Sequence, residues 1–574
     1  MESFKSPVAR LARLFQTSRD AWKAKALDKQ RRLRAAQVKI RDLEASRAQW
    51  KERALAAEAE AARRDAEPTP GAEADEPEAT AQRLARLPPA GHHHSLLVMQ
   101  LTLQMYLKAG LGSRGVPRVL QLLAPWFAVG VPAYTTVLNW VYRGGLAVLQ
   151  RPPERREDWI YVVDHTIALG TAKCLVILGI PASRLVETGY RPRHQAMQVL
   201  AVEVTEHSTG AWVATVLYEV AQRTGRPVQI VADHGSDLLK GITLFQQNHA
   251  PDCVETDDIS HRIATRLKAD LTADERWNGF LAHARATLAS FQQTDLAFLL
   301  PPRQRTKARF MHFDAQVEWA QQVLAYADRG DFSAIRRPCV LSVAAWEHLR
   351  GRLGATRVQP LHALIGPRYP DKTALSQALQ AASDLTLDAL DDAFWDLADT
   401  GRARFLEGFA WVKSYRDDLV VYAQMMEQSK AIQTFLKSEG LHAGVCEPLR
   451  ATLAPPAALT PRATDFTNRI LEQVAREAAK IPSGQTWLAS SDIIESVFGK
   501  YKTFTSRSPL KEVGRLVLAI PAFLTDLTTG VIGDAMASVR TLDVEHWVKT
   551  HLGDSMLARR RQAFRALLAD RETA

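Results

Sequence analysis

The chain has 574 residues, a formal net charge of +10 and a pI of about 9.4, and 46% of its residues are hydrophobic. No apolar stretch is long enough to span a bilayer, so the composition predicts a soluble protein without a membrane partner. Four scattered cysteines without C-x-x-C spacing argue against a disulfide framework or structural zinc site and favour a reducing cytoplasm. The basic charge is compatible with nucleic-acid binding, and the length predicts about three or four structural units.

The first predicted element is a basic helical arm at residues 1–65. Residues 18–27 recur as residues 46–55, an offset of 46 − 18 = 28 residues or four heptads. Trp22, Leu43 and Trp50 share one heptad position, while Lys29 and Arg47 interrupt the apolar seam. This pattern predicts a marginal coiled coil or a single long helix. Two interpretations stay open, namely a self-associating or DNA-contacting arm and a solvated helix without a partner. Residues 66–91 are acidic and Pro-rich, which is typical of a linker.

Residues 92–150 are predicted to form a compact helical module. One helix covers 96–109, a second follows Ser113, and a third is opened by Pro132 and ends at Gly144. A helix, a short turn and a second helix resemble a helix-turn-helix, although an ordinary helical hairpin has the same pattern. If the last helix enters the major groove, its polar side chains face base edges or phosphates: Thr135, Thr136, Asn139 and Arg143.

Acidic residues close two of the predicted buried strands. Asp164 follows the apolar run 159–163, and Asp233 follows the run 228–232. Ligand sites in open α/β sheets lie beyond the carboxyl ends of strands. Glu495 lies far downstream on a predicted helix, where Asp492 is a competing acid. Three carboxylates converging at the sheet would suit Mg²⁺, with Mn²⁺ as a substitute, because Mg²⁺ prefers oxygen ligands.

The predicted catalytic core at 155–271 contains three strands followed by alternating helices and strands. The strands are expected at 159–163, 174–178, 199–204, 228–232 and 253–255, with helices at 211–223 and 238–248. This order is that of the RNase H-like fold, so we expect an α/β mixed sheet. Residues 272–484 are expected to form an all-α insertion whose tryptophans are mostly core, before residues 485–530 complete the core. A basic helical tail follows at 531–574.

With these elements in place, residues 155–270 and 485–515 resemble the DDE transposases of bacterial insertion sequences. The resemblance implies that Asp164, Asp233 and Glu495 are the catalytic, metal-binding acids. Glu495 and Lys502 resemble half of a signature of one transposase group, but its Tyr and Arg are missing and position 491 is Ser. Lys500 and Lys502 are expected to hold DNA phosphates. The segment from Asp258 to His261 resembles a supporting motif found after the fifth strand.

The resemblance implies two-metal phosphoryl transfer on double-stranded DNA, both transposon ends and target. Asp164 would bridge both metal ions, with Asp233 on one and Glu495 on the other. Because two ends must be held together, we expect a homodimer or higher oligomer on DNA, associated with the bacterial nucleoid. Two alternatives stay open: a catalytically inactive or domesticated DNA-binding regulator, and a structure-specific nuclease of the same fold.

Overall fold

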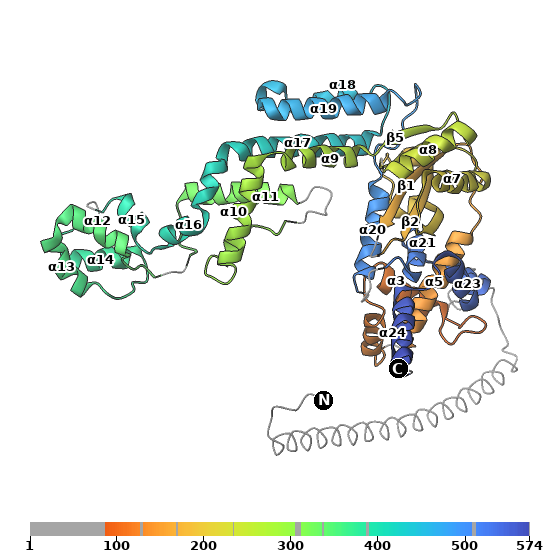
Figure 1. The fold of residues 1–574 in the computed structure, drawn as a ribbon, viewed down its shortest axis with the longest axis horizontal. Coiled ribbons are helices and arrows are strands. Elements are labelled where there is room, and N and C mark those ends of the chain that lie inside the picture. The colour runs from red at the N-terminus through yellow and green to blue at the C-terminus, as the bar shows by residue number, and fades with distance from the viewer. Residues whose placement is uncertain are drawn as a thin grey trace, which may run out of the picture. The chain divides into compact units, whose positions relative to one another are not determined.

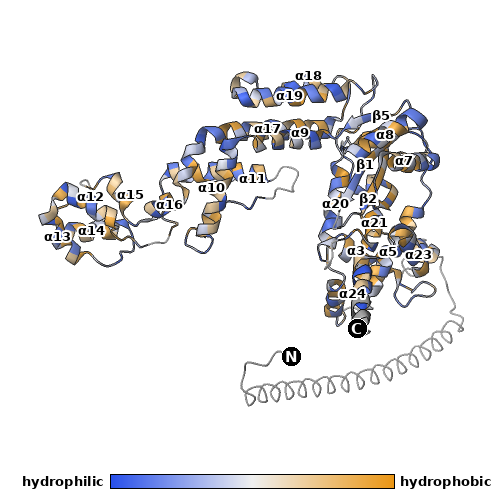
Figure 2. Ribbon diagram, viewed as in Figure 1, coloured by the Kyte–Doolittle hydropathy of each residue, from blue (hydrophilic) through white to orange (hydrophobic). Residues whose placement is uncertain are grey.

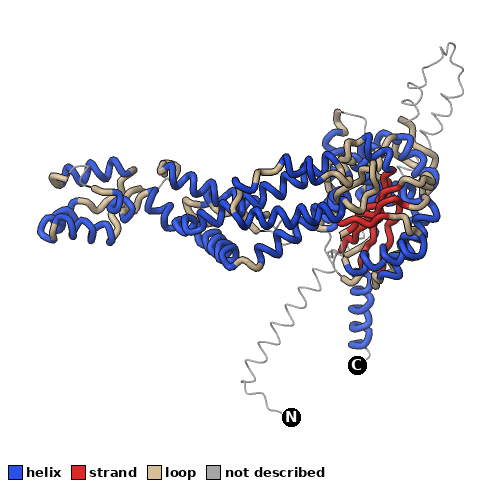
Figure 3. The backbone as a smooth tube through the Cα atoms, turned by 90° about the horizontal axis from the view of Figure 1, so that it is seen from above, coloured by secondary structure: helices blue, strands red, loops and turns tan. Residues whose placement is uncertain are grey.

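The computed structural model describes residues 86–126, 130–167, 170–233, 235–304, 312–335, 338–385, 390–507 and 512–572. The predicted arm at 1–65 and most of the linker lie outside these residues, so the heptad interpretation stays a prediction. A mixed sheet and many helices make up the described chain (Figures 1 and 3). None of the helices in the described ranges is both long and apolar enough to cross a membrane.

The sheet has five strands in the spatial order β3-β2-β1-β4-β5. Strands β1, β2 and β3 pair antiparallel, whereas β4 pairs parallel to β1, and β5 parallel to β4. Three successive strands followed by two helix–strand steps were expected from the sequence, and this strand order is that of an RNase H-like core. The strands are β1 (Trp159–Ile167), β2 (Lys173–Pro181), β3 (Gln198–Thr205), β4 (Pro227–Ala232) and β5 (Val254–Asp257).

Each face of the sheet packs against its own layer of helices. Trp159, Tyr161 and Val163 of β1 belong to a core shared with α7 (Gly210–Thr224) and α8 (Ser236–His249). Ile160 and Val162 belong instead to the larger core that contains α20 (Asp492–Thr505) and α21 (Ala519–Leu524). Because successive side chains of a strand point to opposite faces, Asp164 lies on the α20 face and His165 on the α8 face.

Strand β1 is longer than predicted, because it continues to Ile167 as one arm of a hairpin with β2. Asp164 pairs with Val176 of β2, so it lies within the strand rather than after it. Its other neighbour, β4, ends sooner: the last parallel pair joins Val163 to Ala232. The sequence pattern did not predict this extension, because the strand becomes polar at Asp164, just where its parallel neighbour β4 ends.

The N-terminal helical module packs against helices that come after the sheet in the chain. Helices α3 (Leu96–Leu107), α4 (Gly115–Leu123) and α5 (Tyr134–Gln150) contact one another, and α3 and α5 also contact α21 and α22 (Thr529–Ser538). The prediction that the third helix ends at Gly144 is wrong. Helix α5 continues to Gln150, and Gly145 is buried where a Cβ atom would lie 1.6 Å from the Leu518 carbonyl oxygen. The glycine therefore permits close helix packing instead of ending the helix.

Short helices and turns complete the part of the core around the sheet. A helix and a 3-10 turn connect β2 to β3, and further helical segments follow α20. Their bounds are α6 (Ala182–Glu187), η1 (His194–Ala196), η6 (Arg515–Leu518), α23 (Thr541–His551) and α24 (Met556–Glu572).

The insertion is helical, as the sequence predicts, apart from isolated β-bridges such as Cys339 with Tyr369. Its helices carry hydrophilic and hydrophobic residues side by side (Figure 2). Helix α9 (Ile259–Thr272) leads from the core into the insertion. The elements of the insertion are α10 (Glu275–Phe291), η2 (Ala297–Leu299), α11 (Phe313–Arg329), α12 (Val343–Leu353), α13 (Ala355–Leu364), α14 (Lys372–Ala382), α15 (Asp392–Leu397), α16 (Gly401–Phe409), η4 (Ala410–Tyr415), α17 (Arg416–Glu439), α18 (Cys446–Thr452), η5 (Pro456–Ala458) and α19 (Pro461–Ala478).

Tryptophans build the insertion's cores, as expected. Trp277 stacks on Phe280 and is buried, as are Trp319 and Trp395. Trp346 and Trp411 are partly buried against the cores. Helices α12 to α15 have a hydrophobic core of their own, centred on Phe394. The insertion thus has two separate apolar centres, one continuous with the core around the sheet and one local.

Candidate active site

The sheet brings Asp164 and Asp233 side by side. Val163 and Ala232 are partners in the parallel pair of β1 with β4, so the next residue of each chain segment is an aspartate. Val231 packs into the α20-side core, and alternation places Asp233 on that same face. Adjacent strands are about 4.8 Å apart, so the two carboxylates leave the sheet as neighbours.

Glu495 comes from the first turn of α20, which packs against β1. The helix buries Ile494, Val497 and Phe498 against the sheet, and this apolar stripe fixes the rotation of the helix about its axis. Glu495 lies beside the stripe and is partly buried. The structure therefore brings all three predicted acids to one face of the sheet, although Glu495 lies more than two hundred residues after the other two in the chain.

The pKa of Asp164 responds to burial and to its acidic neighbours. Burial raises the pKa of Asp164 well above its ordinary value, and the negative charges of Asp233 and Glu495 raise it further. Two groups act in the opposite direction: the backbone N–H of His165, which donates to Oδ1 of Asp164 at 2.6 Å, and the Lys502 ammonium. The site thus concentrates negative charge where little water can solvate it.

Such a site fits a divalent cation by its donor chemistry, because three carboxylate groups present oxygen ligands and repel one another until a cation binds. Among the described residues, no three His, Cys, Asp or Glu side chains are gathered tightly enough to be a ready ligand set. The three carboxylates therefore share a neighbourhood without forming a closed coordination shell. Asp164, at the centre, is the group whose pKa responds to both others.

Asp258, predicted as a supporting residue, ties α9 to the segment that precedes α20. Its carboxylate caps α9 by accepting the backbone N–H of His261 at 3.1 Å, and it accepts the Ser491 hydroxyl at 2.5 Å. Ser260 donates to Asp492 at 3.3 Å across the same junction. Asp258 is only 1% exposed, so its hydrogen bond with Ser491 is shielded from water. The N-cap of one helix thus fixes the start of the helix that carries Glu495.

Gln229 is a second anchor that the sequence analysis missed. Its side-chain amide donates to the Leu488 carbonyl at 2.8 Å and accepts the Leu488 backbone N–H at 3.1 Å. The amide also donates to the Thr256 hydroxyl at 2.7 Å, and Gln229 is fully buried. A polar side chain inside an otherwise apolar strand signals such a partner, because a buried amide is costly without hydrogen bonds.

A polar network on the α8 face was also missed. The His165 imidazole Nε2 lies 3.2 Å from the Ser208 hydroxyl, and its Nδ1 lies 3.9 Å from Asp237. Lys173 donates to Asp237 at 2.8 Å. Burial would raise the pKa of Asp237, but hydrogen bonds from Lys173 and Ser208 and the neighbouring positive charges outweigh it and hold the pKa at about 2. The network joins the sheet to the first turn of α8, which carries Asp237, four residues after Asp233.

Two lysines follow Glu495 on α20, as predicted. Lys502 is exposed, and its charge reaches Asp164. Lys500 is partly buried and lies 3.1 Å from Nδ1 of His194; burial lowers its pKa. Lys502 is therefore the better placed of the two to meet a phosphate beside the acids.

The exposed side of α5 carries Thr135 and Asn139, while Thr136 is half-buried. Arg143 differs from the prediction, because its guanidinium turns inward. It donates to the carbonyl oxygens of Met536 and Val539, both at 2.6 Å. Arg143 therefore holds the end of α22 against α5, and we leave it out of any DNA-contacting surface.

No described protein family matches the sequence. No curated protein matches it either. Among solved structures, the Drosophila P element transposase strand transfer complex aligns with 75% of this chain and 92% of that chain. The sequence identity is 10% and the TM-score is 0.28, so the likeness is distant and the function rests on the geometry of the site.

Proposed function

We propose that this protein is a DDE transposase of the bacterial insertion-sequence type, which binds transposon-end DNA and catalyses strand cleavage and strand transfer. The observation that carries the proposal is the convergence of Asp164, Asp233 and Glu495 on one face of a sheet with RNase H-like strand order. All three acids are half-buried, and like charges that water solvates only in part repel one another, which destabilises the fold. A catalytic need for bound cations gives a reason for this arrangement.

In the proposed reaction, Asp164, Asp233 and Glu495 would hold divalent cations such as Mg²⁺. Bound Mg²⁺ supplies a nucleophile of lowered pKa and stabilises charge on the phosphate. Water attacks the end phosphodiester, the bond from phosphorus to the 3′ oxygen breaks, and a free 3′-hydroxyl remains. That hydroxyl then attacks a target phosphate, forming one phosphorus–oxygen bond as another breaks. Lys502 is proposed to hold a non-bridging phosphate oxygen, because it is exposed and its charge lowers the pKa of Asp164.

The proposed DNA contacts involve α5, and the proposed reaction requires two transposon ends. Thr135, Thr136 and Asn139 are proposed to face the major groove. Pairing of two ends calls for at least two protomers, and the arm at 1–65 is proposed to help hold them together.

Cleavage assays on the DNA that flanks the gene test the proposal. The wild-type protein should cleave the ends with Mg²⁺ and join them to target DNA. Asp164→Asn, Asp233→Asn and Glu495→Gln should each bind the same DNA and fail to cleave it. Asp492→Asn is the control for the competing acid on the same helix; it keeps an oxygen that accepts the Ser260 hydroxyl and should still cleave. Cleavage without joining would favour the nuclease alternative, and binding without cleavage by the wild type would favour a regulator.

A further inference from the structure

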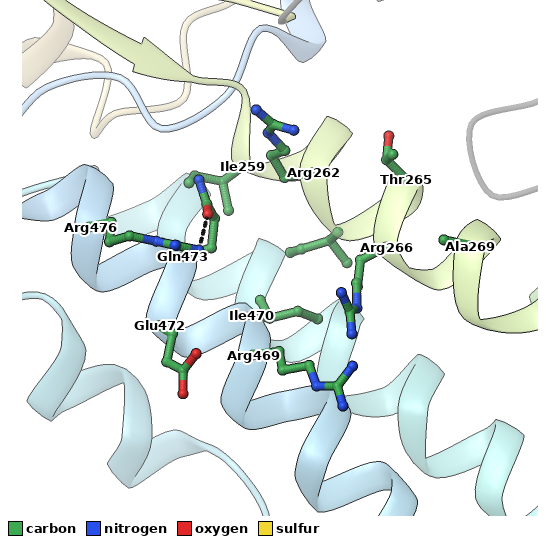
Figure 4. A pocket seen from close by; sticks show the side chains of 11 residues that line it. Ile259, Arg262, Thr265, Arg266, Ala269, Arg469, Ile470, Glu472, Gln473 and Arg476 are labelled. Atoms are coloured by element: carbon green, nitrogen blue, oxygen red, sulfur yellow. Dashed lines mark hydrogen bonds between the residues drawn. The ribbon is translucent and has the colours of Figure 1, made fainter.

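A groove runs between α9 and α19 at the start of the insertion, outside the site of the three acids. It has a volume of about 620 Å³, and arginines line both walls (Figure 4). Arg262 and Arg266 come from α9, and Arg469 and Arg476 come from α19, against a single lining acid, Glu472. The floor is apolar, since Ile263 and Ile470 are 1% and 4% exposed. The charged rims therefore stand on two helices that the protein core holds in place.

The arginines form two short rows. Arg262 and Arg266 are four residues apart on α9, and Arg469 and Arg476 are seven apart on α19, so each pair lies on one side of its helix. Four residues of helix rise about 6 Å, so each row offers donors along a line rather than at one point. Figure 4 shows Arg266 and Arg469 reaching into the same space from opposite walls. A linear polyanion fits such rows better than a single ion does.

Existing partners orient these arginines without using all their donors. Arg469 pairs with Asp465 at 2.7 Å and Arg266 with Asp270 at 3.5 Å, each on its own helix. The Nε–H of Arg266, which is the atom that faces Asp270, is buried and makes no hydrogen bond within the described chain. Arg262 donates to Asp257 at 2.8 Å. The side chains of Arg469 and Arg266 are 50% and 38% exposed, and exposed pairs of this kind contribute little to stability. A phosphate can therefore replace the carboxylates of Asp465 and Asp270, because a guanidinium has five N–H donors in a fork that matches phosphate oxygens.

The location of the groove supplies the last argument. Helix α9 begins immediately after β5, and β5 is the parallel neighbour of β4, whose end carries Asp233. The groove thus starts at the edge of the sheet where the acids lie. Gln473 on its wall donates to Asp257 at the end of β5, which fixes α19 to the same edge. A DNA strand that leaves the acids along this edge meets the groove next.

We propose that the groove between α9 and α19 binds the phosphodiester backbone of duplex DNA, as a second contact outside the catalytic site. This inference rests on the proposed function for the identity of the polyanion. The contact is electrostatic and does not read sequence, so it adds equally to the affinity for end DNA and for any other duplex.

The test measures DNA binding by the full-length chain in the presence of EDTA, so it does not depend on catalysis. Arg266→Ala/Arg469→Ala should weaken binding to flanking DNA and to random duplex alike, by roughly tenfold at moderate salt. The salt dependence of log K should lose about two units of slope. The matched control is Arg402→Ala/Arg416→Ala, which removes the same charge from insertion arginines of 42% and 48% exposure. That variant should bind like the wild type.

Two further measurements make the result decisive. Arg266→Lys/Arg469→Lys should restore most of the salt slope and part of the affinity, because charge returns without the fork. Unchanged thermal midpoints check the fold of every variant. DNA binding by the alanine pair equal to wild type, or an equal loss in the control pair, overturns the proposal. The proposal is also overturned if the alanine pair changes the binding of inorganic pyrophosphate but leaves the affinity for DNA unchanged. Failure of cleavage with intact groove binding would instead count against the proposed function alone.

Discussion

At the scale of single residues, two carboxyl groups near the site have pKa values shifted in opposite directions. The groups are Asp164, whose pKa is raised, and Asp237, whose pKa is lowered, and they lie on opposite faces of the sheet. Asp164 is surrounded by acids and buried, whereas Asp237 receives hydrogen bonds from Lys173 and Ser208. The first carries the proposed chemistry, and the second holds the first turn of α8 in place. Their contributions to stability therefore depend on pH with opposite signs.

For Asp164 the folded pKa lies above the unfolded value of about 3.9, so its contribution to stability is complete below that pH. The contribution is lost as pH rises through the folded pKa, because the fold then holds a buried negative charge beside two others. We predict that Asp164→Asn raises the urea midpoint of the metal-free protein at pH 7. The gain should shrink towards pH 4. A variant less stable than wild type at pH 7 would contradict this.

For Asp237 the folded pKa of about 2 lies below the unfolded value, so its contribution is present above about pH 4 and lost as pH falls towards 2. We predict that Asp237→Asn lowers the free energy of unfolding at pH 7 by roughly 1–2 kcal/mol. Urea titrations at several pH values should show the difference closing in acid. Asp526→Asn is the control, since its pair with Lys108 is 61% exposed on the acid side and should contribute about 0–1 kcal/mol.

At the scale of elements, the position of α20 depends on the segment that precedes it. Gln229 fixes Leu488, and Asp258 fixes Ser491, so the sheet edge and α9 both determine where Glu495 lies. The insertion enters through α9 and returns through this segment. A small set of buried hydrogen bonds thus joins the insertion to the catalytic helix.

We predict that Gln229→Ala lowers the free energy of unfolding by about 2–4 kcal/mol, because it leaves the buried Leu488 N–H and carbonyl without partners. Cleavage should fall more than DNA binding, since Glu495 loses its fixed position. Chemical denaturation and paired binding and cleavage assays measure both effects. Gln322→Ala removes an exposed amide bonded to Glu318 and should change neither. Equal effects of the two substitutions would refute the anchoring role.

Helix α5 gives a prediction that separates recognition from packing. Asn139→Ala should cost about 1–3 kcal/mol on end DNA and little on random duplex, because a base contact is specific. Arg143→Ala should instead lower the thermal midpoint, since the carbonyls of Met536 and Val539 lose their donor. Binding titrations on both duplexes, with melting curves, distinguish the two. Equal loss on both duplexes for Asn139→Ala would place it on phosphate only.

At the scale of the whole molecule, the role of the three acids as one metal site stays a prediction, whereas the residue pattern predicted the order of the strands along the chain and the helical character of the insertion. Hydrophobic periodicity carries that information, because each strand and helix shows its buried face locally. It did not predict the continuation of α5 through Gly144 and Gly145, the inward turn of Arg143 or the Gln229 anchor. Those features depend on partners hundreds of residues away, such as Leu518 and Leu488, which no local pattern specifies.

The central claim is that three distant segments build one metal site, and a direct titration of metal tests it. Mn²⁺ binding to the full-length protein with end DNA, followed by electron paramagnetic resonance, counts bound ions. The account predicts saturable binding by wild type and by Asp492→Asn, and its loss or marked weakening in Asp164→Asn, Asp233→Asn and Glu495→Gln. Unchanged stoichiometry and affinity in those three variants would contradict the account.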